Sequence, residues 1–314
     1  MAKKRGNTTS IYLMMVGGLG NQLFEYAFAR CLNLEIPGSS LTIDVGSYEK
    51  YKLRKYELNH FNIPSGIRVI SHCLPPLKKI KFWFFKTLHR IEFKFLRKGP
   101  TNAKRFPDFL MKRNLRFGVI TCFDCFYHRI DTEILRRKKD IFILGYFQSP
   151  QYFQPHKKEI FTELQPVVDN EAVLSFCEEN MVSGATNCYS FRCSELKKLG
   201  LFLEDFNPRY FDKATRTLHS LNSNRTVLLT EDPESAKTYL SHYGDYLPAY
   251  AFLPHEQLYI MIRCSTFVIS NSSFSWWGSY LSLGKSKTVI TPRFWYKGVE
   301  TKSIGLFFDE MHII

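Results

Sequence analysis

The stretch VGGLGNQLFEYAFA, residues 16–29, places three glycines within four positions, directly after the apolar run IYLMMV at residues 11–16. The run has the length of a buried strand. A helical pattern follows the glycines, with apolar residues at Leu23, Phe24, Ala27, Phe28 and Cys31. LTIDV, at residues 41–45, has the character of the next strand. This order predicts the opening βαβ unit of a parallel sheet, with Asn21 as a candidate cap of the helix.

Strands and helices continue to alternate along the chain. Further strands, two of them followed by a turn and a helix, are predicted within residues 141–149, 186–196, 226–240, 265–283 and 287–292, with a helical segment over 163–184. A length of 314 residues suits one large or two medium domains, and 45% hydrophobic residues suffice for their cores. We therefore predict an α/β fold of two Rossmann-like, doubly wound domains, residues 1–160 with a basic insertion at 76–116, and residues 161–314.

Polar turns follow four of the predicted strands, where ligands bind in folds of this type. They are Gly17–Gln22, Arg192–Glu195, Thr230–Asp232 and Asn271–Ser275. The glycine turn and the NSSFSWWG turn, residues 271–278, each lead into a helix, whose first N–H groups favour a phosphate or carboxylate. Each turn also has a structural interpretation, the first as a tight connection and the second as a helix cap.

The remaining two turns carry charged side chains. Arg192 could pair with a diphosphate through two nitrogens, although an arginine there equally suits a surface salt bridge. Glu231 and Asp232, beside Thr230, could accept hydrogen bonds from a ribose or a purine edge, and they equally suit an acidic helix start. The residues leave both interpretations open.

Metal ligands do not gather in any recognised pattern. The chain has no DxD and no HExxH motif, and Cys122 and Cys125 form a lone CxxC without a second pair. We therefore expect neither a metal nor another cofactor, and we expect the eight cysteines to be reduced thiols. The first ten residues lack the apolar core of a signal peptide, and no apolar run reaches the ~18 residues of a membrane span. These features predict a cytoplasmic protein.

The positive charge is concentrated in one segment. Of the formal net charge of +14, residues 78–116 carry +11, and aromatic residues are interleaved with the lysines. Such a segment favours peripheral contact with the inner face of a membrane, or else forms a solvated face whose aromatics pack inward. Nucleic acid is not expected, since no nucleic-acid module is recognisable.

Two long motifs carry a family resemblance: GGLGNQLFEYAFA at 17–29 and NSSFSWWGSYL at 271–281 resemble the most distinctive motifs of the α-1,2-fucosyltransferase family. RKYELNHFNI, GYFQSPQYF, LLTEDPESAK and TPRFWY follow in the family's order. The resemblance implies a GT-B fold, with two Rossmann-like domains facing a central cleft. It further implies GDP-fucose as donor, inversion at the anomeric carbon and no metal. The N-terminal domain would be the acceptor side, and the C-terminal domain would bind the nucleotide sugar.

One motif departs from the family. The family carries a His-x-Arg-Arg-x-Asp signature, and the matching stretch here is SFRCSE, residues 190–195, which keeps the first arginine as Arg192 and a carboxylate as Glu195. The resemblance implies catalytic roles for Arg192, Asn21 and Glu195. It implies donor binding by Gly17, Gly18, Gly20, Gln22, Arg192, Thr230, Glu231, Asp232, Asn271, Ser272, Ser273, Phe274 and Ser275.

The resulting hypothesis is fucose transfer to a glycan or lipid-linked glycan hydroxyl, with the 2-OH of galactose as the expected acceptor. Because the signature is altered, two alternatives stay open. One is a related glycosyltransferase that uses another nucleotide sugar, and the other is a member that binds sugar or nucleotide without turnover.

Overall fold

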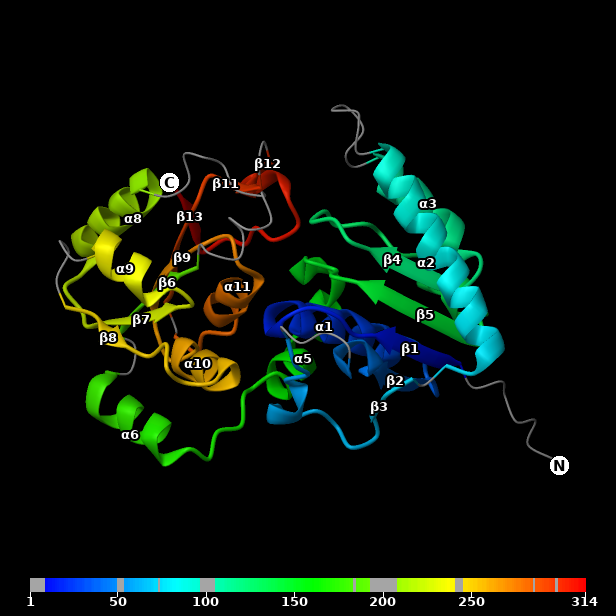
Figure 1. Cartoon of the computed structure of the whole chain (residues 1–314), viewed down its shortest axis with the longest axis horizontal. Helices are drawn as coiled ribbons and strands as arrows, with labels where there is room; N and C mark the ends of the chain where they lie inside the picture. Colours follow the sequence, from blue (N-terminus) through cyan, green and yellow to red (C-terminus); the bar gives the residue numbers. More distant parts are fainter. Residues whose placement is uncertain are drawn as a thin grey trace. The chain divides into compact units, whose positions relative to one another are not determined.

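The computed structural model describes residues 9–49, 54–72, 74–96, 105–182, 185–192, 208–240, 245–284, 286–296 and 299–314 (Figure 1). The chain forms two compact units. The first comprises Met1–Asn59 and Ile63–Leu164, and the second comprises His60–Asn62 and Gln165–Ile314. Each unit is built on its own parallel sheet, so the predicted α/β class with two Rossmann-like sheets is confirmed.

The first unit contains a five-stranded sheet in the order β3-β2-β1-β5-β4. Its strands are β1 Ser10–Met14, β2 Ser40–Asp44, β3 Arg68–Ile70, β4 Val119–Cys122 and β5 Asp140–Gly145. All their pairings are parallel. The central strands are buried on both faces, which is the reason that their sequences are apolar without alternation.

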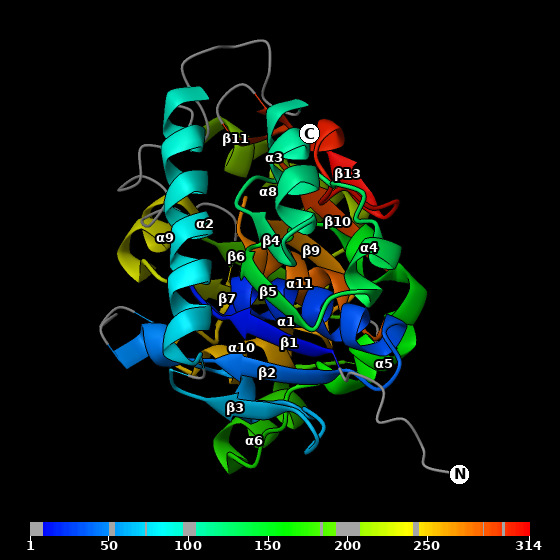
Figure 2. The same ribbon diagram turned by 90° about the vertical axis from the view of Figure 1, so that its right-hand side faces the viewer.

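Helices cover both faces of this sheet. They are α1 Leu19–Glu35, α2 Pro76–Leu96, α3 Arg105–Leu115, α4 Thr132–Arg136 and α5 Lys157–Glu163. Short 3-10 helices are η1 Gly46–Glu49, η2 Leu58–His60, η3 Pro150–Tyr152 and η4 Gln154–His156. In two perpendicular views α1 lies on one side of the sheet, and α2 and α3 lie on the other (Figures 1 and 2).

The start of α1 differs from the sequence-based expectation. The helix begins at Leu19, and its N-cap is Gly18, which has no side chain to bond the first amides. Asn21 therefore lies inside the first turn, and its predicted role as the cap is wrong. The glycine pair lets the chain turn into the helix three residues earlier than a side-chain cap at Asn21 would allow.

The second unit contains a six-stranded sheet in the order β13-β10-β9-β6-β7-β8. The strands are β6 Asn187–Phe191, β7 Thr226–Thr230, β8 Leu247–Pro248, β9 Thr266–Ile269, β10 Thr288–Thr291 and β13 Met311–Ile313. Helices are α6 Glu171–Asn180, α8 Pro208–Leu221, α9 Pro233–Leu240, α10 Pro254–Met261 and α11 Ser273–Tyr280. A small hairpin of β11 Phe294–Tyr296 and β12 Val299–Glu300 precedes η6 Thr301–Ser303.

Two further boundaries correct the sequence reading. The helix predicted over 163–184 is not continuous: α5 ends at Glu163, α6 begins at Glu171, and Pro166 lies in the extended link between them. The strand predicted to reach Leu196 ends at Phe191. Residues 193–200, and with them Glu195, lie outside the described residues.

The basic insertion forms α2 and α3, and its aromatics divide between two environments. Phe82 and Phe85 are buried against Val119, Phe142 and other sheet residues, whereas Trp83 and Phe84 are exposed. The side chains of Phe93 and Phe95 lie outside the described residues. Within the described ranges, no helix combines the length and the apolarity needed to cross a membrane.

Candidate functional site

The order of the second sheet gathers three of the polar turns. Strands β9, β6 and β7 are neighbours, with Ser190 paired to Ile269 and Phe191 paired to Thr230. Because the strands are parallel, their carboxyl ends lie at one edge. Turns separated by about forty residues each along the chain therefore meet there.

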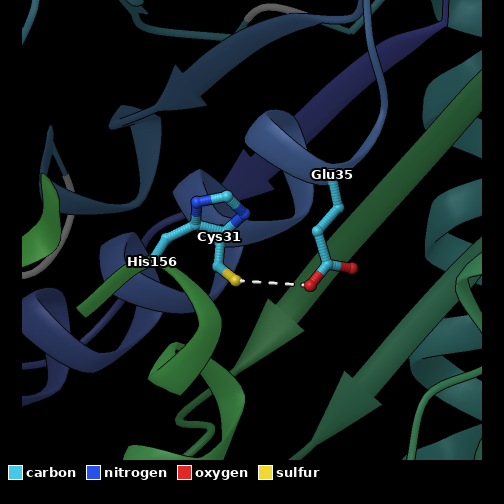
Figure 3. A group of neighbouring side chains, drawn as sticks. All are labelled: Cys31, Glu35 and His156. Atoms are coloured by element: carbon cyan, nitrogen blue, oxygen red, sulfur yellow. Dashed lines mark hydrogen bonds between the residues drawn. The ribbon is translucent and has the colours of Figure 1, made fainter. Parts of the chain in front are cut away.

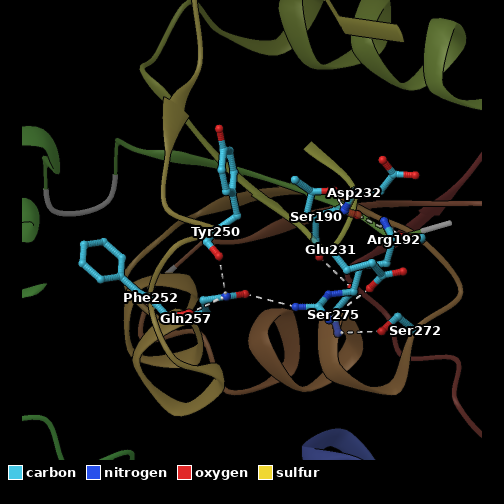
Figure 4. Close-up of polar contacts among 11 residues, drawn as sticks. Ser190, Arg192, Glu231, Asp232, Tyr250, Phe252, Gln257, Ser272 and Ser275 are labelled. Carbon is cyan, nitrogen blue, oxygen red and sulfur yellow. Dashed lines mark hydrogen bonds and ion pairs between the residues drawn. The ribbon is translucent and has the colours of Figure 1, made fainter. Parts of the chain in front are cut away.

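Arg192 lies at the centre of this edge, directly after β6 (Figure 4). Its Nη1 donates to Glu231 Oε2 at 3.3 Å, and its Nη2 donates to Gln257 Oε1 at 3.1 Å. The guanidinium carbon stands 4.2 Å from the centre of the Phe274 ring. The side chain is thus held as an oriented plane between two acceptors and an aromatic face, a geometry that a lysine does not reproduce.

Gln257 is a site residue that no sequence pattern singles out. It lies on α10, is buried, and donates from Nε2 to the carbonyl oxygen of Phe252 at 2.7 Å and to that of Tyr250 at 3.3 Å. These bonds fix its amide orientation, so that Oε1 faces Arg192 (Figure 4). A glutamine in such a helix carries no motif, and only the packing of α10 against α11, which brings Gln257 to Arg192, identifies it.

The two acidic residues of the turn after β7 have different roles. Asp232 accepts from Ser235 N at 3.1 Å and from Ser235 Oγ at 2.7 Å, and its own N–H donates to Thr230 Oγ1 at 2.9 Å. These bonds tie Asp232 and Thr230 to the start of α9. Glu231 instead faces Arg192. The turn is therefore both an acidic helix start and the source of a carboxylate at the site.

The turn after β9 leads into α11. Ser272 is the N-cap and accepts from Ser275 N at 3.5 Å, and Ser275 Oγ lies 2.7 Å from Ser190 Oγ. Asn271 donates from Nδ2 to Trp295 O at 2.8 Å, while its buried Oδ1 has no donor among the described residues. Ser273 is the first, half-buried residue of α11. This edge therefore offers a helix N-terminus and a buried acceptor beside Arg192.

The glycine turn of the first unit follows β1 and is held by hydrogen bonds to side chains of the same unit. Gly17 has a φ of +83°, which a residue with a Cβ rarely adopts. Its carbonyl oxygen accepts from Tyr48 Oη at 3.0 Å and from Gln22 Nε2 at 3.1 Å. Val16 N donates to Glu25 Oε2 at 3.0 Å. These inward bonds fix the turn before any ligand arrives.

The glycines of this turn differ in environment. A Cβ at position 17 would stand 2.9 Å from Asn21 Nδ2, and one at position 18 would stand 3.3 Å from Arg54 Nε. Gly20 is a buried residue in the first turn of α1. The left-handed backbone is therefore at Gly17. Arg54, whose position in the sequence carries no site motif, brings a cation beside the turn.

Asn21 and Gln22 have different positions on α1. Asn21 is half-buried, and its Oδ1 accepts from Gln148 Nε2 at 3.0 Å. Gln22 is fully buried, and besides Gly17 it bonds Lys55 O at 2.7 Å and Glu57 N at 2.9 Å. The Gln22 amide is thus used to join the glycine turn to the 54–57 segment, which makes it a positioning residue.

Glu25 is the second residue that positions the glycine turn. Its carboxyl group is completely buried, and Oε1 has no hydrogen-bond partner among the described residues. Burial raises the pKa of Glu25 well above its ordinary value, and the bond from Val16 N lowers it only in part. The site therefore favours the protonated acid over the carboxylate.

Potential metal ligands gather at two places in the first unit. Cys31, Glu35 and His156 have donor atoms within 4.8 Å of one another (Figure 3), as do Cys122, Asp124 and His128. The Cys31 thiol lies 3.7 Å from Glu35 Oε1, and burial together with Glu35 raises the pKa of this thiol to about 12. The proton that the thiol keeps in this environment is shared with the Glu35 carboxylate, so a contact within the protein accounts for this group.

In the second group, His128 is enclosed by carboxylates. Its Nε2 lies 2.7 Å from Asp124 Oδ1, and Asp108 faces its Nδ1. Burial alone would lower the pKa of His128, but the bonds and charges of Asp124 and then Asp108 outweigh burial and raise it. Cys122 and Cys125, the lone CxxC, are buried free thiols whose pKa burial raises. Both groups are explained by contacts within the protein.

The sequence of this chain is similar to those of glycosyltransferases. The profile of glycosyl transferase family 11 matches residues 207–303. The chain is 25% identical to the O-antigen biosynthesis glycosyltransferase WbnK of Escherichia coli over 313 residues, 92% of this chain and 95% of that protein. It is also 25% identical over 300 residues to an alpha-1,2-colitosyltransferase of Escherichia coli, covering 92% and 93% of the two chains.

Solved structures match the fold. The fucosyltransferase NodZ from Bradyrhizobium superposes with a TM-score of 0.53 at 14% identity, covering 87% of this chain and 92% of that one. NodZ alpha-1,6-fucosyltransferase soaked with GDP-fucose gives a TM-score of 0.52 at 15% identity, with the same coverage. At these identities the likeness establishes the architecture alone.

The two parallel Rossmann-like sheets, with polar turns at the carboxyl ends of their strands, have the GT-B architecture. More particularly, this chain is a glycosyltransferase related to glycosyl transferase family 11, and the resemblance indicated by its two long motifs is confirmed.

Proposed function

We propose that the protein transfers fucose from GDP-fucose to a glycan hydroxyl, with inversion and without a metal. The observation that carries the proposal is the orientation of Arg192 between Glu231 and Gln257, over Phe274 and beside the start of α11. A diphosphate is a ligand that such a guanidinium and a helix N-terminus stabilise together. NodZ, which has this architecture, was studied with GDP-fucose.

The second unit would hold the donor. Arg192 donates from Nη1 to Glu231 and from Nη2 to Gln257. A diphosphate would therefore share this guanidinium with these two residues or take the place of Glu231. Asn271 Oδ1, buried and without a donor among the described residues, would accept from a hydroxyl or N–H group of the nucleotide sugar. Ser272, Ser273 and the first amides of α11 would complete the anion site.

The reaction would be a single displacement. The acceptor oxygen forms a bond to the anomeric carbon as the bond from that carbon to the diphosphate oxygen breaks. The electron pair of that bond leaves with GDP, where Arg192 stabilises the charge. The acceptor proton passes to a base. Glu195 stays the candidate for this base by its place in the sequence, and it lies outside the described residues.

The first unit would hold the acceptor. Its glycine turn is fixed by Gln22, Tyr48 and Glu25, with Asn21 and Arg54 beside it. We propose that Asn21 orients the reacting groups and that the acceptor is the 2-OH of a galactose in a glycan or lipid-linked glycan. The second curated relative is named for an alpha-1,2 linkage, which supports this position.

We further propose that the reaction takes place in the cytoplasm, at the inner face of a membrane, where a lipid-linked acceptor would lie. The basic segment 78–116 is the part of the chain suited to that contact.

A second candidate differs in the sugar that is transferred. The colitosyltransferase has the same 25% identity to this chain as WbnK, which favours considering another nucleotide sugar as donor. The altered signature around Arg192 also keeps open a member that binds nucleotide without turnover.

A donor screen separates these functions. The full chain is incubated with GDP-fucose, GDP-mannose and UDP-sugars, with and without a galactose-terminated acceptor, and nucleotide release is measured. We expect release of GDP from GDP-fucose that increases with the acceptor. Turnover of a different nucleotide sugar alone would replace fucose in the proposal. Binding of GDP without turnover of any donor would contradict the enzymatic function.

A further inference from the structure

Helix α2 carries apolar side chains on two opposite faces. On the inner face, Phe82 and Phe85 pack into the core cluster of the first sheet. Its outer face exposes Leu77 by 82%, Ile80 by 65%, Trp83 by 65% and Phe84 by 56%. In both views α2 lies on the outside of its unit (Figures 1 and 2). Contiguous exposed apolar residues of this kind mark an interaction surface.

The four exposed residues form one stripe. At 3.6 residues per turn, positions 77, 80, 83 and 84 fall within an arc of about 120° that extends for ~10 Å along the helix. The inner residues, Phe82 and Phe85, lie on the opposite side of the same wheel. The stripe, here called the outer face of α2 and consisting of Leu77, Ile80, Trp83 and Phe84, is therefore separate from the surface that folds the domain.

Lysines border the outer face on both sides. On the helical wheel Lys79 lies at one margin and Lys81 at the other, and both are exposed. The Lys81 ammonium stands 5.7 Å from the centre of the Phe142 ring, so this side chain must extend away from that ring to reach a partner on the outer face. Lys78 is directed inward, where it pairs with Asp140 and contacts Tyr12. Residues 76–96 contain six Lys or Arg and a single acid, Glu92. The partner must therefore be both apolar and negatively charged.

An anionic lipid surface has this combination of properties. Apolar and aromatic side chains enter the boundary between head groups and acyl chains, while lysines at the margins extend to the phosphates. Tryptophan is favoured at that depth because its ring is apolar and its N–H is polar. A nucleic acid would satisfy the lysines but would leave Leu77 and Ile80 exposed to water.

We propose that α2 binds an anionic membrane by its outer face, with Leu77, Ile80, Trp83 and Phe84 inserted and Lys79 and Lys81 at the head groups. The inference does not rest on the proposed transfer reaction, because membrane binding is measured without donor or acceptor. Failure of the donor screen would leave it standing, and failure of membrane binding would leave the proposed chemistry standing.

Trp83 provides a direct readout. The chain has four tryptophans, and the other three, Trp276, Trp277 and Trp295, are at most 1% exposed. A change in tryptophan emission on adding vesicles therefore reports the environment of Trp83. We expect a blue shift, and protection from acrylamide quenching, with vesicles of phosphatidylglycerol and phosphatidylcholine. Vesicles of phosphatidylcholine alone should have a much smaller effect.

Sedimentation with the same vesicles tests the residues. Trp83→Ser with Ile80→Ser should reduce partitioning at least tenfold, whereas Val182→Ser with Leu221→Ser, two exposed apolar residues of the second unit, should not. Lys79→Glu with Lys81→Glu should reduce it by about fivefold or more for each position at low salt. Lys158→Glu with Lys302→Glu, an equal change of charge at exposed sites elsewhere, should have a small effect.

Three outcomes would overturn the proposal. The first is no binding to anionic vesicles, and the second is equal binding to neutral and anionic vesicles. The third is binding during which the emission of Trp83 does not change. Concentration-dependent self-association that protects Trp83 in the absence of lipid would instead assign the outer face to a second copy of the chain, and it would also contradict the lipid assignment.

Discussion

Replacing Arg192 tests whether the edge of the second sheet acts on a diphosphate. The structure holds this side chain by hydrogen bonds to Glu231 and Gln257 and by its stacking on Phe274. Arg192→Ala removes the charge and all three contacts. Arg192→Lys keeps the charge but cannot place two donors in a fixed plane over the ring.

The substitution affects both catalysis and folding. Loss of a group that stabilises transition-state charge costs about 2.7–4 kcal/mol, so Arg192→Ala should lower kcat about 10²- to 10³-fold. Arg192→Lys should fall between this variant and the wild type. The folding cost is of similar size, since each of the two hydrogen bonds contributes about 1 kcal/mol and a largely buried cation–π contact about 0.5–2 kcal/mol. This sum is below the roughly 5–15 kcal/mol by which a folded protein is stable, so both variants should fold.

The assay measures GDP release and sugar transfer, with thermal unfolding of each variant measured in parallel. Arg216→Ala, an exposed arginine of α8 paired only on the surface with Asp212, is the matched control and should retain normal kcat. If Arg192→Ala kept kcat within about fivefold of the wild type, the guanidinium would not stabilise the leaving group, and the proposed chemistry would lose its central residue.

Three further predictions concern two residues of the first unit and the expectation that the reaction needs no metal. Gly17→Ala should lower the free energy of unfolding by about 1–2 kcal/mol because of the left-handed backbone, and its Cβ should displace Asn21 and so lower the rate of sugar transfer. Gly38 has a similar φ with open space around it, so Gly38→Ala should lower stability alone. Equal rates of sugar transfer by the two variants would contradict the role of Asn21. Burial raises the pKa of Glu25 in the folded protein, so the stability that its proton contributes should be lost as the pH rises from the pKa of the unfolded state toward that of the folded state. Glu25→Gln should remove this loss when the free energy of unfolding is measured between pH 4 and 8. Identical pH profiles for the wild type and the variant would refute the prediction. Transfer should persist in excess EDTA, and an activity that EDTA abolishes and Mn²⁺ restores would reverse the expectation of a metal-free reaction.

Local patterns in the sequence were sufficient for the class of fold. An apolar run, a glycine turn and a helical face at residues 11–31 predicted a βαβ opening, because the spacing of side chains along a strand or helix is fixed by local geometry. The same alternation indicated two sheets. The pattern was misleading near Pro166. There the polar, helix-compatible composition is continuous, but the proline interrupts the helix and separates α5 from α6.

The start of α1 shows the limit of local reasoning. Asn21 has a side chain suited to capping, but the helix begins at Leu19 because Gly17 can adopt a left-handed backbone that Tyr48 and Gln22 then fix. Tyr48 is 31 residues away from Gly17. No pattern near the turn indicates such a partner.

The sequence by itself determined the two Rossmann-like domains, the polar turns at the ends of strands and the concentration of positive charge in one segment. The tertiary structure decided which turns meet. Arg192, Glu231 and Phe274 come together because β9, β6 and β7 are neighbours, and Gln257 joins them because α10 packs beside them. It also decided which aromatics of α2 are buried. Side-chain periodicity defines the faces of an element, whereas the order of strands in a sheet depends on contacts between distant segments, which no local pattern encodes.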